Sequence, residues 1–127
     1  MEEEIKSHKD LIVWQKGMLL SVEIYKLTEQ FPQREIYALA SQMRRAAVSI
    51  PSNIAEGRSR GTVKDFSHFL RISYGSASEL ETQLDISRRL SLCKEAEYQR
   101  LGILLTEVSK MLRAMIKKLG EREGAKN

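Results

Sequence analysis

Residues 36–60, IYALASQMRRAAVSIPSNIAEGRSR, have two distinct faces when they are read at helical spacing. Apolar residues recur every three or four positions, as expected for a helix that buries one face. This stripe comprises Ile36, Leu39, Met43, Ala46 or Ala47, Ile50 and Ile54. Polar residues follow a second stripe at the same spacing, made of Gln42, Arg45, Ser49, Asn53 and Glu56. Pro51 has no N–H and disfavours helix at the residue before it, so we expect a helix over about residues 34–60 with a kink or break near Pro51.

A helical pattern also precedes this stretch. It begins after Ser7 or Asp10, either of which is a possible cap, and it ends at about Gln30 because Phe31 precedes Pro32. Its expected buried stripe comprises Leu11, Trp14, Met18, Val22 and Tyr25, widened by Ile12, Leu19, Leu20, Ile24 and Leu27. An apolar face this wide predicts contact with more than one neighbour.

Two further helices are expected after residue 60. The third runs from about Val63 to Leu90 with Thr62 as its cap, and its stripe comprises Phe66, Phe69, Leu70, Ser73, Ala77, Leu80 and Leu84. Gly75 costs about 1 kcal/mol relative to alanine inside a helix, which favours close approach of another backbone there. The fourth runs from about Lys94 to Leu119 and stops at Gly120. Its stripe comprises Leu101, Leu104, Val108, Met111 or Leu112, and Met115.

Four long helices with short connections predict an all-α, antiparallel up-down-up-down four-helix bundle. We expect one domain over residues 1–127, with a core at about 8–120 and flexible segments at 1–7 and 121–127. The chain contains 21 Lys and Arg against 17 Asp and Glu, a net charge of +4, which is a mild basic bias. It shows no secretory signal or membrane span, and its single cysteine fits a reducing compartment, so we expect a cytoplasmic protein.

No motif for catalysis, a cofactor or a metal occurs in the sequence. His8, His68 and Cys93 lack the spacing of metal ligands, no GxSxG elbow is present, and Gly57 to Gly61 lacks the lysine that a phosphate loop requires. We therefore expect no enzyme activity, no cofactor and no metal.

Two motifs resemble one known family. The segment Asn53-Ile54-Ala55-Glu56-Gly57 is followed by Gly75-Ser76, two further residues, and Glu79-Leu80-Glu81. Together with Pro32, Glu35, Gln42, Arg45, Ala46, Ala47, Ser49, Phe66, Phe69 and Leu70, they resemble the four-helix bundle family of 23S rRNA-intervening sequence proteins. The resemblance covers about residues 11–119, and Ser73, where alanine is expected, departs from the pattern.

The resemblance implies a homopentameric barrel of bundles around a central channel. It also implies distant kinship with the accessory variability determinant proteins of diversity-generating retroelements, pentamers that bind nucleic acid and a reverse transcriptase. The family name describes where the genes were found, inside extra segments of large-subunit rRNA genes, and it does not specify a biochemical role.

Basic residues form two candidate nucleic-acid-binding groups, because lysine and arginine can neutralise phosphates. The candidates are Arg44, Arg58, Arg60, Lys64, Arg71, Arg113, Lys117 and Lys118. The alternative is a structural role, since cations at a helix C-terminus complement the helix dipole and charged surfaces aid solubility.

The polar stripe suggests a structural or interface network that fixes helix register and oligomeric state. Its expected members are Gln42, Arg45, Ser49, Asn53, Glu56, Gly75, Glu79 and Glu81. An acid–base or metal site built on paired carboxylates is the alternative.

The leading hypothesis is a non-enzymatic, self-associating protein that binds RNA or DNA electrostatically, with a partner protein as a further possibility and no membrane association. Its alternative is a protein–protein assembly module, without nucleic acid, that uses the apolar first helix and the small residues around Gly75.

Overall fold

The computed structural model describes the backbone of residues 7–126 and the side chains of residues 7–124. Four long α-helices account for most of this part of the chain: α1 (Ile12–Glu29), α2 (Ser41–Ser59), α3 (Val63–Arg89) and α4 (Glu95–Lys126). Short helical segments, η1 (His8–Asp10), η2 (Gln33–Glu35) and η3 (Ile36–Ala40), precede α1 and α2. Residues 7–126 contain no strand, which confirms the predicted all-α class with four helices.

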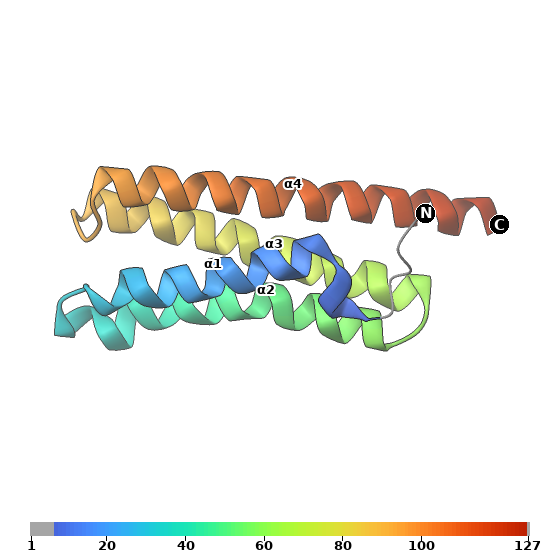
Figure 1. Ribbon diagram of the computed structural model, residues 1–127, viewed down its shortest axis with the longest axis horizontal. Helices are drawn as coiled ribbons and strands as arrows, with labels where there is room; N and C mark the ends of the chain where they lie inside the picture. Colours follow the sequence, from blue (N-terminus) through green and yellow to red (C-terminus); the bar gives the residue numbers. More distant parts are fainter. Residues whose placement is uncertain (1–6, 127) are drawn as a thin grey trace.

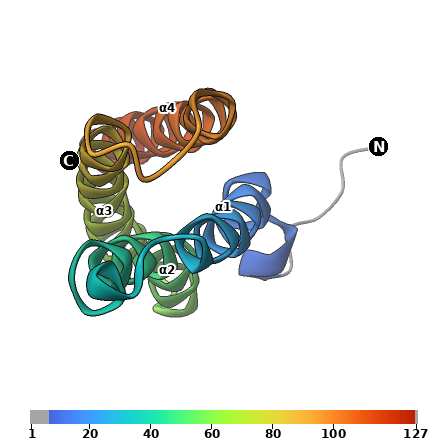
Figure 2. The same cartoon turned by 90° about the vertical axis from the view of Figure 1, so that its left-hand side faces the viewer.

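The helices lie side by side, and successive helices run in opposite directions along the long axis (Figure 1). Seen from the end, α2 lies between α1 and α3, and α4 lies next to α3 (Figure 2). Two ion pairs join α1 to α4, namely Lys16 Nζ to Glu107 Oε1 at 2.7 Å and Arg100 to Glu23 at 3.1 Å. None of the helices within residues 7–126 combines the length and apolarity needed to span a bilayer.

A continuous apolar core connects the four helices. Its fully buried large side chains are Leu20 and Ile24 of α1, Met43, Ile50 and Ile54 of α2, Leu70 and Leu80 of α3, and Leu101, Leu105 and Leu112 of α4. The stripe predicted for residues 36–60 is buried from Leu39 onward, whereas Ile36 is exposed at its edge. The segment predicted for α3 matches the observed helix closely, and Thr62 caps it by accepting a hydrogen bond from the Asp65 N–H at 3.1 Å.

The face that α1 buries differs from the predicted one. Met18, Val22 and Tyr25 are 42%, 48% and 44% exposed, whereas the buried stripe begins at Val13 and Gly17 and continues through Leu20, Ile24 and Leu27. Apolar residues occupy most of the helix circumference, so their periodicity does not select one face. Gly17 lies on the buried face against Ile50 and Pro51 of α2, at ordinary packing distance.

Pro51 lies inside α2, which continues through it as one helix, so of the predicted kink or break the break is wrong. Proline removes the N–H that would bond to the carbonyl four residues earlier, which is that of Ala47. Ser21 Oγ of α1 lies 3.0 Å from this carbonyl oxygen and 3.0 Å from the Gly17 carbonyl oxygen, so its one hydrogen is shared between them, and it is the side chain placed to satisfy the Ala47 carbonyl. The backbone is irregular earlier instead, at residues 36–40, where Ala38 has φ −117° and ψ −107°.

Gly75 is exposed, and no atom lies within 4 Å of the position of an added Cβ. The close approach predicted there is therefore wrong for the single chain, because Gly75 lies on the outer side of α3. The tight contact between α2 and α3 is at Gly57, where a Cβ would lie 2.7 Å from Phe69 Cβ. Ser73 strengthens the same helix pair by donating to the Ile50 carbonyl oxygen at 2.9 Å.

Helix α4 continues to Lys126, so the predicted stop at Gly120 is wrong. A glycine ends a helix when it adopts the left-handed conformation, and Gly120 keeps a helical one. Buried Leu119 holds this part of α4 against the core. Of the segments expected to be flexible, residues 121–126 are thus helical, and residues 1–6 lie outside the described part of the chain.

Candidate functional site

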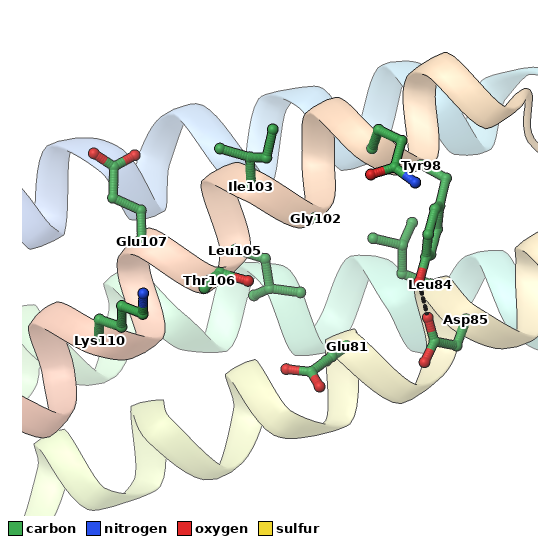
Figure 3. A pocket seen from close by; sticks show the side chains of 11 residues that line it. Glu81, Leu84, Asp85, Tyr98, Gly102, Ile103, Leu105, Thr106, Glu107 and Lys110 are labelled. Carbon is green, nitrogen blue, oxygen red and sulfur yellow. Dashed lines mark hydrogen bonds between the residues drawn. The ribbon is translucent and has the colours of Figure 1, made fainter.

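A groove of about 610 Å³ lies between α3 and α4 near the turn that joins them (Figure 3). Carboxylates from both helices line it, with Glu81 and Asp85 on α3 and Glu107 on α4. Lys110 is the lysine of this lining, and Ile103 supplies an exposed apolar side chain. The acidic lining makes this groove unfavourable for phosphate groups.

A polar cluster fastens α3 to α4 beside this groove. The Tyr98 hydroxyl donates to Asp85 Oδ1 at 2.5 Å, and the two side chains point toward each other in Figure 3. This hydrogen bond is the main reason that the pKa of Tyr98 is raised above its ordinary value of 10.0. The Arg88 guanidinium lies 4.4 Å from the centre of the Tyr98 ring and donates twice to Glu95, at 2.9 and 2.8 Å.

Hydrogen bonds also shift the pKa of the Glu95 carboxyl. The bond from Gln99 is the main cause that lowers this pKa, followed by the bond from Arg88. The bond to Glu95 in turn raises the pKa of Arg88. Sequence reasoning missed the cluster because Asp85 and Tyr98 are on different helices, and no local motif links residues that meet only across a turn.

The two candidate basic groups lie toward the opposite end of the molecule. A cavity of about 340 Å³ is lined there by Arg58, Gly61, Thr62, Val63 and Phe66 around the α2–α3 joint, by Leu119 and Arg122 of α4, and by Leu11. The joint and the C-terminal half of α4 thus share one end, at the right of Figure 1. We call Arg58, Arg60, Lys64, Arg71, Arg113, Lys117, Lys118 and Arg122 the basic end. Arg122 was missed because α4 was expected to stop before it.

The cations of the basic end differ in their partners. Arg60 pairs with Glu56 at 2.8 Å and lies 5.2 Å from the centre of the Phe69 ring. By contrast, five exposed side chains have no ion pair within the part of the chain that the structure describes: Lys64, Arg71, Arg113, Lys117 and Lys118. Unpaired exposed cations are the ones available to neutralise phosphates.

Arg44 does not belong to this surface. Its Nε donates to Thr28 Oγ1 at 2.7 Å, and its guanidinium lies 4.7 Å from the centre of the Tyr25 ring. These contacts hold Arg44, half-buried, between α1 and α2. The structure therefore places Arg44 in the packing between α1 and α2, and its predicted nucleic-acid contact stays a prediction.

Part of the predicted polar network lies around a depression of about 460 Å³ between α2 and α3. Its lining residues are Gln42, Arg45, Ala46, Ser49, Ser76, Glu79 and Gln83. Ser49 Oγ and Ser76 Oγ share a hydrogen bond of 2.8 Å, and Asn53 donates to Ser49 Oγ at 2.9 Å. Gln83 Oε1 is buried and has no hydrogen-bond partner among the described residues.

The predicted ion network does not form within the described chain. Arg45 contacts Ser41 Oγ at 3.4 Å and has no ion pair with Glu79 among residues 7–124. Glu81 follows Glu79 by two positions, so the two side chains point about 200° apart around α3. Glu81 therefore lines the acidic groove between α3 and α4 and not the depression between α2 and α3. Glu56 pairs with Arg60, and Gly75 contacts no other helix. No group of three or more His, Cys, Asp or Glu side chains in the described chain is placed to hold a metal ion.

The fold and these residues correspond to a known protein family. Residues 9–114 match the profile of the family described as 23S rRNA-intervening sequence protein. The chain belongs to this family. The match includes α1, α2, α3 and most of α4, and it confirms the resemblance seen in the two sequence motifs.

The chain is also similar to a solved structure. It aligns with a protein of unknown function from the S23 ribosomal protein family of Bacteroides thetaiotaomicron, with 27% identity and a TM-score of 0.76. The alignment covers 84% of this chain and 99% of that one. No curated protein matches the chain. Membership of the 23S rRNA-intervening sequence protein family thus establishes the kind of protein and leaves its activity to be inferred from the surface.

Proposed function

We propose that this protein is a non-enzymatic binding protein that holds RNA or DNA electrostatically at its basic end. The observation that carries the proposal is that the α2–α3 joint and the C-terminal half of α4, which carry the two basic groups, lie at one end of the molecule, where Arg58 and Arg122 line one cavity. Counterions released from the nucleic acid would supply most of the free energy of binding. A cytoplasmic location is part of the proposal.

The same proposal includes assembly into a homopentamer of up-down-up-down bundles. The alternating helix directions in Figure 1 support the bundle topology, and the pentamer follows from the family resemblance. In a closed ring, each basic end would be repeated around the symmetry axis. Five copies of a modest positive charge would then face one nucleic-acid chain.

A neutralised variant tests the basic end. Lys64→Gln, Lys117→Gln and Lys118→Gln together remove three exposed charges that have no ion pair in the described chain. Binding to labelled RNA hairpin, single strand and duplex DNA is titrated at about 50 and 200 mM salt. For duplex DNA, the slope of log affinity against log salt should fall by about 2.7 in magnitude if all three lysines contact phosphate.

The matched control removes three charges at the other end of the molecule, by Lys26→Gln, Arg89→Gln and Lys94→Gln. All three side chains are exposed, so both variants lose the same net charge. We expect the control to bind almost as the wild type does. An Arg58/Arg60 double substitution should also weaken binding. Equal loss in the two triple variants, binding that ignores salt, or no binding at about 50 mM salt would refute the proposed function.

A protein–protein assembly module is the second candidate, favoured by the outer side of α1. Met18, Val22 and Tyr25 form an exposed apolar stripe there, and a stripe of this kind is typical of an interaction surface.

Size measurement tests the α1 stripe, and pull-down distinguishes the two candidates. Val22→Glu should lower the molecular mass observed by sedimentation if the α1 stripe joins subunits, whereas Lys26→Glu on the same helix should not. Protein partners that remain bound to the wild-type chain after nuclease treatment, together with absent nucleic-acid binding, would support the assembly module instead.

A further inference from the structure

A second groove between α3 and α4, of about 500 Å³, is separate from the acidic one. It is lined by Arg71 and Tyr74 of α3 and by Arg113 and Ile116 of α4. Each helix therefore contributes one guanidinium and, three residues later, one large apolar side chain. Residues three apart lie on the same side of a helix, so the two pairs face a common space.

The walls of this groove are fixed, while its cations are accessible. Tyr74 and Ile116 are half-buried and pack against the apolar core. Arg71 and Arg113 are exposed, and neither has an ion pair within the described chain. The groove thus combines a held aromatic side chain and an aliphatic side chain with two positive charges that lack an anion.

A matching ligand needs a flat, apolar ring linked to anionic groups. Unpaired bases stack on aromatic side chains, and arginine binds phosphate with two parallel hydrogen bonds. We propose that this groove holds an unpaired nucleotide of a single strand, with its base against Tyr74 and its flanking phosphates at Arg71 and Arg113. This inference rests on the proposed function and specifies the form of nucleic acid that the basic end selects.

The remainder of the α3–α4 surface supports this placement. The acidic groove lies nearer the α3–α4 turn, and its carboxylates, Glu81, Asp85 and Glu107, outnumber its one lysine, Lys110, so it is less favourable for phosphates than the groove at Tyr74. The basic end supplies Lys117, one helical turn beyond Arg113. A paired duplex keeps its bases stacked inside, so it could contact the arginines but not Tyr74.

The test separates stacking from charge by fluorescence anisotropy. The probes are a labelled ten-nucleotide single-stranded RNA, an abasic strand of the same length and charge, and a duplex. The wild type should bind the normal strand about tenfold more tightly than the abasic strand, since stacking of one base contributes a factor of this order. Tyr74→Leu should remove this advantage and leave duplex binding unchanged, whereas Tyr74→Phe should retain it. Tyr37→Leu, at an exposed tyrosine on η3, is the control and should have no effect.

The arginine pair gives an independent measurement. Arg71→Gln with Arg113→Gln should reduce the salt slope for the single strand by about 1.4, or about 0.7 for each lost phosphate contact. Tyr74→Leu should leave that slope unchanged. If Tyr74→Leu does not fold, the normal and abasic strands compared on the wild type still test whether a base is bound, and the Arg71→Gln with Arg113→Gln variant still tests whether the strand lies in this groove.

Two results separate failure of this inference from failure of the proposed function. If the wild type binds normal and abasic strands equally, the stacking site is refuted while electrostatic binding stands. If the wild type binds none of the probes at about 50 mM salt, both proposals are refuted.

Discussion

The Ser21 hydroxyl is predicted to hold α2 together at Pro51, and its removal should destabilise the protein. Pro51 leaves the Ala47 carbonyl without its usual helical donor, and Ser21 Oγ lies 3.0 Å from that oxygen. Ser21 and Ala47 are both buried, so water cannot easily replace the hydroxyl. Ser21→Ala therefore creates an unsatisfied buried acceptor.

The expected loss of stability follows from the unsatisfied Ala47 carbonyl. An unsatisfied buried acceptor costs about 1–3 kcal/mol, and the better helix propensity of alanine returns about 0.5 kcal/mol. We expect Ser21→Ala to lower the free energy of unfolding by about 0.5–2.5 kcal/mol. For a chain of this size, this corresponds to a fall in Tm of about 2–9 °C.

A double-mutant cycle with Pro51→Ala isolates the cause. Alanine at position 51 restores an N–H that can bond to the Ala47 carbonyl, so Ser21→Ala should cost less than about 0.5 kcal/mol in that background. The expected coupling is about 1 kcal/mol or more. The cycle cancels the loss of proline packing against Gly17, which is common to both Pro51→Ala proteins.

Urea unfolding of the four proteins at one fixed protomer concentration provides the measurement, since association would shift apparent stability. Ser52→Ala, an exposed serine on the same helix, is the control and should change stability little. An equal cost of Ser21→Ala with and without Pro51 would show that the Ala47 carbonyl is not the source, and would refute this explanation.

Two further predictions concern glycine and tyrosine. Gly57→Ala should destabilise the protein by about 1–3 kcal/mol, since its Cβ would lie 2.7 Å from that of Phe69. Gly75→Ala should stabilise it by up to about 1 kcal/mol, because alanine favours helix and nothing lies near the added Cβ. A higher Tm for Gly57→Ala than for Gly75→Ala in thermal unfolding would contradict this packing. The hydrogen bond from Tyr98 to Asp85 raises the folded-state pKa of the tyrosine above its ordinary value of 10.0. Its stabilisation is therefore complete below that value and is lost as the pH rises through the folded-state pKa. The stability difference between the wild type and Tyr98→Phe should narrow in alkaline unfolding experiments, and a constant difference would show that this hydrogen bond is not responsible.

Local signals in the sequence determined the helices themselves. The span of α3 was predictable because Thr62 provides a cap and the apolar spacing continues without proline to the turn after Arg89. The buried stripe of α2 was predictable for a similar reason, since its other side is polar. Such signals depend on neighbours along the chain, so the sequence alone contains them.

Features that depend on contacts between helices were predicted incorrectly from the sequence. The apolar circumference of α1 did not reveal that Met18, Val22 and Tyr25 would remain exposed. A glycine in the sequence does not show what it faces, so Gly75 was expected to be packed and Gly57 was not. Pro51 was expected to kink or break its helix, and the donor that compensates for its missing N–H lies on α1, 30 residues earlier.

The candidate site was predictable in residue type and not in arrangement. Basic residues around Arg58 and around Lys117 were recognisable in the sequence, but their convergence depends on α4 returning along α3 and extending past Gly120. Arg44 was indistinguishable from them until the structure showed it bonded to Thr28. Helix formation depends on contacts within a few residues, so the sequence pattern by itself determined where the helices form. The helix faces that meet depend on packing among all four helices, so only the tertiary structure decided them.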